Sequence, residues 1–390
     1  MLRKLLIGIL FIFCGHLLAA TNFLTLSDLH YGARNISGNG NDTNDILWLS
    51  TLAKFKQLTT KADFIIMLGD LPSHFTKNSA EKSDYEAKIF HDLFEADITK
   101  KPLFYVSGNN DPLTGNYLAF SQNEKSPLDN ALDWNGACAN CDGLLIDDAN
   151  MRSEGYYSTY VSKASKDVIL IVLNTTQFIN VPYWFPRDAY PEREDDATRQ
   201  LGWLSEQLKQ HQARQLLIAM HEEPGVDYQN NPVWNPLFLQ RFIQILNSAQ
   251  GKNQQISLLT AHSHYDELRK ITLDNNKHVF SYATPSISRS HYNNSGMKMF
   301  SLTNDFRLKN FTTYYTAIDN QWNEDHYQAI GSSQNSIFPS CSGMDLAQCL
   351  ESLSNEQVCA RMESEHIYGV KNPEVNYTHC LNSYKIQLAT

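Results

Sequence analysis

Five short apolar runs in this chain are each closely followed by an aspartate, an asparagine or a histidine. Runs of this length and composition are typical of strands buried on both faces. The first run, Phe23–Leu26, leads to Asp28 and His30, which point the same way if the extended backbone continues, because strand side chains alternate between two faces. An oxygen and an imidazole ligand side by side suit a divalent metal ion of the zinc, manganese or iron type.

The same arrangement recurs along the chain. Core packing readily explains one histidine at a strand end, but it does not readily explain five polar strand ends in order. In α/β sheets, the ends at which strands finish form the crevice that binds ligands. The residues after the four later runs are Asp70 after Phe64–Leu68, Asn109 after Leu103–Val106, His221 after Leu216–Met220, and His262 and His264 after Ile256–Leu259.

Amphipathic stretches with helical spacing lie between several of the apolar runs, and Asp45–Thr60 is one of them. Continuous apolar strands that alternate with helices predict sheets covered by helices, which is an α/β sandwich. Further strands are predicted at Val168–Leu173 and Val279–Tyr282, and further helices at Ser79–Ala96, Thr198–His211 and Pro236–Ala249.

Residues 1–20 predict an export signal. A basic start is followed by an apolar run from Leu5 to Leu18 and by Ala19 and Ala20, which is the order found in a cleaved secretory signal. The apolar run is short for a retained membrane anchor, and no later stretch approaches ~20 uninterrupted apolar residues. We therefore expect a secreted or periplasmic, soluble protein without stable membrane insertion.

The cysteines point to the same compartment. Of seven cysteines, Cys14 would leave with the signal, and an even remainder in an exported chain favours disulfides. Cys138 and Cys141 could pair within one loop. The other four allow three connectivities, and a zinc cluster is an alternative that their irregular spacing disfavours. These four are Cys341, Cys349, Cys359 and Cys380.

We predict three parts of the chain: the signal peptide 1–20, a catalytic domain 21–315 and a C-terminal helical cap region 316–390. Short helices are expected in the cap at Met344–Leu353 and Glu356–Ser364. The formal net charge of -10 argues against bulk nucleic acid as a partner. It is compatible with a small phosphorylated substrate, because bound metal ions can reverse the charge locally.

The ordered strand ends resemble the calcineurin-like metallophosphoesterases, whose pattern runs D-x-H, G-D, G-N-H-[D/E], H, G-H-x-H. The resemblance extends from Phe23 to about Thr313. Within that superfamily the chain is most similar to the acid sphingomyelinase-like phosphodiesterases. The segments that carry this closer resemblance are Gly69-Asp70-Leu-Pro-Ser-His74, Gly202-Trp203-Leu204, Ala261-His262-Ser-His264-Tyr-Asp266-Glu267 and Ala283-Thr-Pro285-Ser286.

The resemblance implies a β-sandwich flanked by helices and a pair of metal ions. One ion would be held by Asp28, His30, Asp70 and His264, and the other by Asp70, Asn109, His221 and His262. A bridging carboxylate holds two ions roughly 3.5–4 Å apart, so that a hydroxide between them can attack phosphorus in line. The histidine-rich set favours zinc, with manganese or iron possible.

The chain departs from the family pattern at Gly108-Asn109-Asn110-Asp111, where Asn110 replaces the histidine that usually protonates the leaving oxygen. An asparagine can donate a hydrogen bond to the phosphate but cannot supply a proton. His74 is the natural substitute, because sphingomyelinase-like members carry a histidine there. Asp111 either orients a metal ligand or caps its own loop.

These features predict a metal-dependent phosphodiesterase that acts on soluble phosphodiesters or nucleotide-type pyrophosphates. Sphingomyelinase carries a saposin-like domain ahead of its catalytic motif, and Asp28 leaves no room for one. Sphingomyelin phosphodiesterase and endopolyphosphatase are alternatives, and a catalytically degenerate metal- or phosphate-binding protein is a rival of another class. Four aromatic residues either line the substrate site or pack a loop: Tyr183, Trp184, Phe185 and Tyr190.

Overall fold

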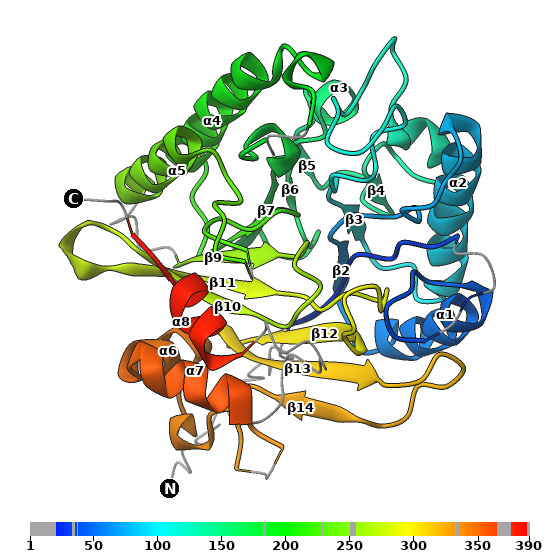
Figure 1. Cartoon of the computed structure of the whole chain (residues 1–390). Helices are drawn as coiled ribbons and strands as arrows, with labels where there is room; N and C mark the ends of the chain where they lie inside the picture. Colours follow the sequence, from blue (N-terminus) through cyan, green and yellow to red (C-terminus); the bar gives the residue numbers. More distant parts are fainter. Residues whose placement is uncertain are drawn as a thin grey trace, which may run out of the picture.

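Two β-sheets packed face to face form the centre of the computed structural model (Figure 1). The structure describes residues 21–32, 36, 38–181, 185–227, 229–249, 255–332, 335–364 and 376–387. The predicted signal peptide therefore lies outside the described residues. Among the residues that are described, no helix is both long enough and apolar enough to cross a membrane.

The first sheet has seven strands in the order β14-β13-β12-β1-β2-β3-β4. Its central strands β1, β2 and β3 run parallel, so their carboxyl ends lie at the same edge. The long strand β12 joins the sheet antiparallel to β1. The strands are β1 (Asn22–Leu26), β2 (Phe64–Met67), β3 (Leu103–Tyr105), β4 (Cys138–Ala139), β12 (Ser295–Leu302), β13 (Leu308–Thr316) and β14 (His326–Gln328).

The second sheet has eight strands in the order β15-β10-β11-β9-β8-β7-β6-β5. Its four central strands β11, β9, β8 and β7 are parallel. The strands are β5 (Leu145–Asp147), β6 (Tyr157–Tyr160), β7 (Val168–Val172), β8 (Gln215–Ala219), β9 (Gln255–Thr260), β10 (Leu268–Thr272), β11 (His278–Ala283) and β15 (Lys385–Ile386). The runs predicted to be strands are thus confirmed, with small differences at their ends.

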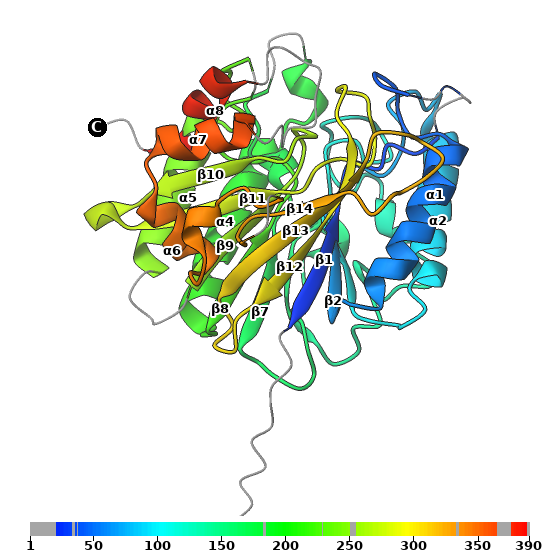
Figure 2. The same ribbon diagram turned by 90° about the horizontal axis from the view of Figure 1, so that it is seen from below.

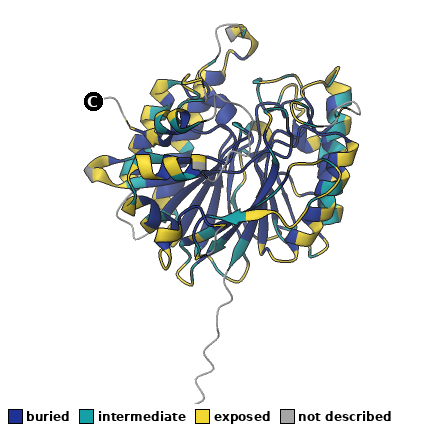
Figure 3. Ribbon diagram, turned by 60° about the horizontal axis from the view of Figure 1, so that its bottom comes forward, coloured by how far each residue is buried: buried dark blue, intermediate teal, exposed yellow. Residues whose placement is uncertain are grey.

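The side chains of β7 alternate between two apolar cores, which explains why every residue of this strand is apolar. Leu170 and Val172 face the core between the two sheets, whereas Ile169 and Ile171 face the core beneath the helices on the other side. Burial on both faces removes the polar alternation expected of a half-exposed strand. Figure 3 shows this burial through the sheets.

Helices cover the outer faces of both sheets (Figure 1, Figure 2). α1 and α2 lie on one side, and α4 and α5 on the other. The side chains of Asn44 and Asn78 cap α1 and α2 by accepting hydrogen bonds from backbone N–H groups of the first turn. The helices are α1 (Asp45–Thr59), α2 (Ser79–Ala96), α3 (Met151–Glu154), α4 (Arg193–Gln210) and α5 (Pro236–Ala249).

The C-terminal region forms three short helices beside β10 and β13: α6 (Leu346–Ser352), α7 (Asn355–Ser364) and α8 (Tyr377–Tyr384). Disulfides join Cys341 to Cys349 and Cys359 to Cys380, and a third joins Cys138 to Cys141. β14 and β15 lie beyond residue 315, and β14 pairs with the first sheet and β15 with the second. The domain boundary predicted at 315/316 is not tested by this pairing and stays a prediction.

Candidate metal centre

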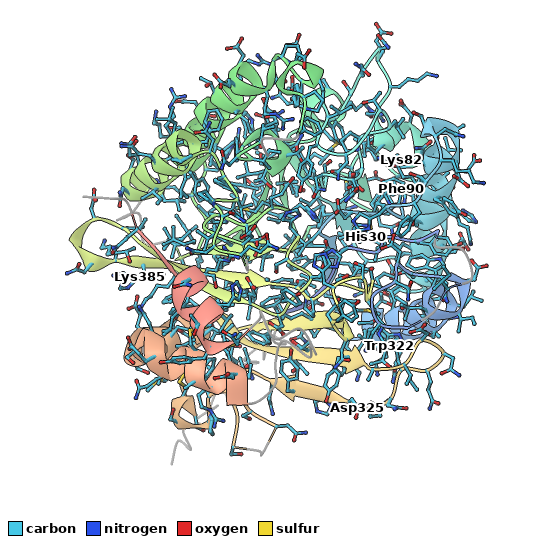
Figure 4. All side chains as sticks on the ribbon, in the orientation of Figure 1. His30, Lys82, Phe90, Trp322, Asp325 and Lys385 are labelled. Atoms are coloured by element: carbon cyan, nitrogen blue, oxygen red, sulfur yellow. A yellow bond between two sulfur atoms is a disulfide. The ribbon has the colours of Figure 1, made fainter. Side chains whose placement is uncertain are left out.

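The predicted ligands converge where the carboxyl ends of β1, β2 and β3 meet those of β8 and β9. Asp28, His30, Asp70, Asn109, His221 and His264 are all nearly or fully buried, and His262 is partly buried. His30 lies near the middle of the molecule (Figure 4). The arrangement follows from topology, because parallel strands of both sheets finish on one side of the sandwich.

The donor atoms fall into two groups. One group contains Asp28, His30 and His264, and the other contains Asp70, His221 and His262; within each group, one donor atom per residue lies within 4.8 Å of the others. Asp70 lies between the groups, since its Oδ2 is 3.4 Å from Nε2 of His30 and 3.3 Å from Nε2 of His221. This is the placement expected of a carboxylate shared by two metal ions.

Several donor atoms of the predicted ligands are buried without a hydrogen-bond partner among the described residues. They are Oδ1 of Asp28, Nε2 of His30, Nε2 of His221 and Oδ1 of Asn109. An unsatisfied buried polar atom costs about 1–3 kcal/mol. Three of these atoms lie close together, because Nε2 of His30 and Nε2 of His221 are 4.0 and 3.7 Å from Oδ1 of Asp28. All four are atom types that bind zinc, manganese or iron. The residues therefore fit a metal pair.

Hydrogen bonds on the far sides of the imidazole rings fix which nitrogen faces the centre. Nδ1 of His30 lies 3.2 Å from the carbonyl oxygen of Pro72, and Nδ1 of His221 lies 2.6 Å from that of Leu68. A carbonyl can only accept, so in the neutral ring Nδ1 carries the proton and Nε2 is the nitrogen left to bind a metal ion. Asn109 is oriented similarly, because its Nδ2 donates to Oδ1 of Asn116 at 2.7 Å.

Five of the predicted ligands have left-handed backbone conformations. The φ angles are 47° at Asp28, 39° at His30, 56° at Asp70, 71° at His262 and 69° at His264. Each such conformation costs on the order of 1–3 kcal/mol and persists only where the surroundings enforce it. Backbone hydrogen bonds do so here: Asp28 N donates to Gly69 O at 2.9 Å, and His30 N donates to Asp70 O at 3.1 Å.

The two glycines before Asp70 and Asn109 are required by close packing. A Cβ on Gly69 would lie 2.5 Å from the backbone nitrogen of Gly108, and a Cβ on Gly108 would collide with Oδ1 of Asp70. The G-D and G-N motifs therefore reflect two strand-end loops in direct backbone contact.

Burial sets the protonation of most of the histidines. It lowers the pKa of both His30 and His262 to about 3, which leaves both rings neutral and able to bind metal at neutral pH. Burial also raises the pKa of Asp28 to about 7, and the nearby Asp70 charge adds to this shift. At His221 burial acts to lower the pKa, but the charges of Asp70 and Asp28 outweigh it and raise the pKa well above its usual value.

Asn110 and Asp111 form hydrogen bonds with the loop that carries Asp70. Asn110 donates to Asp70 twice, from its backbone nitrogen to Oδ1 at 2.8 Å and from Nδ2 to Oδ2 at 2.9 Å. Asp111 accepts from the backbone nitrogens of Asp70, Leu71 and Gly108 and from the hydroxyl of Tyr105. Its carboxylate therefore joins the loop after β2 to the loop after β3, which combines the two roles considered for it.

His74 lies beside the first donor group. Its ring stacks on that of His30 with centroids 3.9 Å apart, and its Nδ1 lies 2.9 Å from Oδ1 of Asp42. Burial acts to lower the pKa of His74, but the hydrogen bond to Asp42 and the Asp42 charge raise it above its usual value. Asp42 was missed by the sequence analysis, since nothing distinguishes it from the other polar residues of its loop.

The two described aromatic residues of the 183–190 segment, Phe185 and Tyr190, have different surroundings. Tyr183 and Trp184 lie outside the described residues. Tyr190 is buried, donates its hydroxyl proton to Asp196 at 2.6 Å and packs under the guanidinium of Arg193, so it has a packing role. Phe185 approaches Tyr117, another residue that the sequence analysis missed.

Comparisons with known proteins show what this chain is similar to. A family model described as calcineurin-like phosphoesterase matches residues 21–279. A relative from Dictyostelium discoideum named "Sphingomyelinase phosphodiesterase D" is 26% identical over 286 residues, which cover 70% of this chain and 59% of the relative. The chain thus spans less than two thirds of that relative's length.

Two solved structures are also similar. Purple acid phosphatase PPD1 from yellow lupin (Lupinus luteus) seeds gives a TM-score of 0.50 at 13% identity, over 80% of this chain and 53% of that one. PhoD gives a TM-score of 0.49 at 12% identity, over 79% and 68%. The match to the lupin protein is a likeness of fold.

Proposed function

Because this chain belongs to the calcineurin-like phosphoesterase family, we propose that it is an exported phosphodiesterase with a dinuclear metal centre. Its substrates would be small phosphodiesters or nucleotide-type pyrophosphates. The observation that carries the proposal is the pair of donor groups joined by Asp70. Within them, Oδ1 of Asp28 and Nε2 of His30 and His221 have no hydrogen-bond partner among the described residues. A diester substrate is supported by the name of the Dictyostelium relative.

Each ion has four protein ligands in this proposal: Asp28, His30, Asp70 and His264 for one, and Asp70, Asn109, His221 and His262 for the other. The amide oxygen of Asn109 adds no charge, so the centre stays cationic enough to attract a phosphodiester. The histidine-rich set favours zinc over manganese or iron. When bound, such a pair lowers the pKa of water and offsets charge on the phosphoryl oxygens.

In this proposal, His74 is the general acid that donates a proton to the leaving oxygen. The side chain of Asn110 cannot release a proton and is directed at Asp70. His74 stacks on His30 of the first donor group, is partly exposed, and has its ring held by Asp42. A positioned general acid typically contributes about 10²–10⁴-fold to rate.

An oxidising location is part of the proposal. Three disulfides among the described residues support an extracytoplasmic compartment, because such bonds are rare in reducing cytosol. The export signal predicted at residues 1–20 agrees with this location.

The rival function is a metal- or phosphate-binding protein that has lost catalysis, and the observation that favours it is Asn110. A measurement of turnover distinguishes the phosphodiesterase from the binding protein. Protein stripped with chelator and reloaded with Zn²⁺ or Mn²⁺ is assayed on bis-p-nitrophenyl phosphate, p-nitrophenyl phosphate, polyphosphate and liposomal sphingomyelin. We expect the diester to be hydrolysed fastest and the activity to disappear with chelator.

The matched variants are Asp70→Asn, which removes the shared carboxylate, and Asp133→Asn, which alters a surface aspartate. The first should abolish turnover and the second should not change it. Tight phosphate binding without turnover from acid to mildly alkaline pH would establish the binding protein instead. If polyphosphate or sphingomyelin is hydrolysed faster than bis-p-nitrophenyl phosphate, that compound class replaces small phosphodiesters as the proposed substrate.

A further inference from the structure

Tyr117 lies beside His262, a predicted ligand that is partly exposed. It follows β3 in the loop that carries Asn109, and it is partly exposed, as is its neighbour His262. The two rings meet edge to face, with centroids 6.4 Å apart and planes at 77°. Tyr117 thus borders the second donor group, whereas His74 borders the first.

The backbone of Tyr117 is strained, and both its N–H and its carbonyl oxygen form hydrogen bonds. Its φ is 59°, an outlier for a bulky residue that is not glycine. Its backbone nitrogen donates to the carbonyl oxygen of Asn109 at 2.8 Å, and its own carbonyl oxygen accepts from Nη2 of Arg193. The same guanidinium donates to the carbonyl oxygen of Thr176, so Arg193 ties the Tyr117 loop to the loop after β7.

The strain is not explained by a hydrogen bond of the side chain. Among the described residues, the phenol oxygen of Tyr117 has no hydrogen-bond partner, in contrast to the buried hydroxyls of Tyr105, Tyr157 and Tyr190. Backbone strain that the surroundings enforce at a partly exposed aromatic residue points to a role in binding. Phe185 extends the aromatic surface, since its ring lies 6.2 Å from that of Tyr117 at 80°.

We propose that Tyr117, together with Phe185, binds a planar aromatic ring of the substrate, such as a nucleobase, beside His262. This inference rests on the proposed function and makes it more specific. Base–aromatic stacking tolerates any base because every base has a π face. Tyr117 would therefore select for the aromatic class of substrate and not for one base.

Two substrates with the same leaving group test this role. p-Nitrophenyl thymidine 5′-phosphate and methyl p-nitrophenyl phosphate both release p-nitrophenolate and carry one negative charge. They differ in the retained group, which is a nucleoside in the first and a methyl group in the second. We expect Tyr117→Ala to lower the thymidine-to-methyl ratio of kcat/KM about tenfold, which corresponds to about 1.4 kcal/mol. Most of the change should be in KM. Tyr117→Phe, which keeps the ring, should restore the ratio, and Phe185→Ala should lower it.

A binding measurement keeps the test independent of catalysis. Calorimetric titration of the metal-loaded protein with thymidine 5′-monophosphate and with inorganic phosphate should show that Tyr117→Ala weakens the nucleotide about tenfold more than phosphate. Equal losses for both ligands, or for both substrates, would overturn the proposal and leave Tyr117 as a packing residue. Failure of all turnover with selective loss of nucleotide binding would contradict the proposed function and still support the aromatic site.

Discussion

The Nδ1 atom of His74 lies 2.9 Å from Oδ1 of the buried Asp42, while the other side of the Asp42 carboxylate accepts from the backbone nitrogen of His74 and from Ser73. Both oxygens are thus used to fix one histidine and its loop. A ring held this way beside His30 is positioned to act on a group bound at the metal centre. In the proposed mechanism, His74 would supply the proton that Asn110 cannot release.

The first prediction concerns the leaving group. His74→Ala should lower turnover of diesters with poor, alkoxide leaving groups by about 10²–10⁴-fold and that of p-nitrophenyl esters much less, because p-nitrophenolate departs without a proton. Asp42→Asn should act in the same direction more weakly. His91 and Asp133 offer a matched surface pair, also 2.9 Å apart, whose substitution should change neither rate. Equal losses on both ester types would rule out proton donation by His74.

The second prediction concerns Asp111. Asp111→Asn replaces one of the two carboxylate oxygens that together accept from three backbone nitrogens and the Tyr105 hydroxyl. Loss of such a support typically lowers metal affinity about 10–100-fold. Competition with a chromogenic chelator measures this affinity, and Asp133→Asn is the control. Wild-type metal affinity in Asp111→Asn would show that the residue only caps its loop.

The third prediction uses two glycines of different surroundings. An alanine at position 108 would place its Cβ against Oδ1 of Asp70, whereas a Cβ on Gly202 in α4 meets nothing within 4 Å. Gly108→Ala should therefore abolish activity, and Gly202→Ala should raise the free energy of unfolding by about 0.5–1 kcal/mol. Urea titrations and diesterase assays check both. Activity retained in Gly108→Ala would show that the two loops separate easily.

The fourth prediction concerns stability in acid. Glu267 is buried, which alone would raise its pKa, but the charge of Arg269 and a hydrogen bond from His379 of α8 lower the pKa from 4.5 to about 2. A carboxyl whose pKa is depressed on folding stabilises the protein above its unfolded pKa. That contribution, on the order of a few kcal/mol, is lost as the pH falls from about 4.5 towards about 2.

Glu267→Gln should therefore unfold at lower urea concentration at neutral pH and show a flatter loss of stability across that acid window. The exposed Glu206, paired with Lys209, provides a control substitution, Glu206→Gln, that should keep the wild-type profile. An acid profile of Glu267→Gln as steep as that of the wild type would contradict the role assigned to this carboxyl.

The sequence alone predicted the strands whose surroundings are uniform. β1, β2, β7 and β8 are apolar on both faces, so their composition revealed them, and the polar residues at their ends could be assigned to one edge. β12 was not predicted, although it is the neighbour of β1. Its fully buried Lys298 is bonded to Asp266 at 2.6 Å, and a lysine in mid-strand reads as exposed unless its partner is known.

The residues missed at the site share one property. Asp42 and Tyr117 belong to loops, and their roles depend on contacts with His74 and His262 that exist only after folding. No spacing or periodicity in the sequence marks such contacts. The candidate metal ligands, by contrast, come shortly after apolar runs, so the order of residues in the sequence was enough to predict them.

The stoichiometry of bound metal tests the central claim most directly. Protein reloaded with Zn²⁺, freed of excess ion and analysed by mass spectrometry should carry two ions per chain. Asp70→Asn should carry fewer than one, because both proposed ion sites include that carboxylate, which lies close to His30 and to His221. Asp133→Asn should keep two. A fully active wild-type preparation that contains no stoichiometric metal, or an Asp70→Asn variant that keeps both ions, would contradict the account.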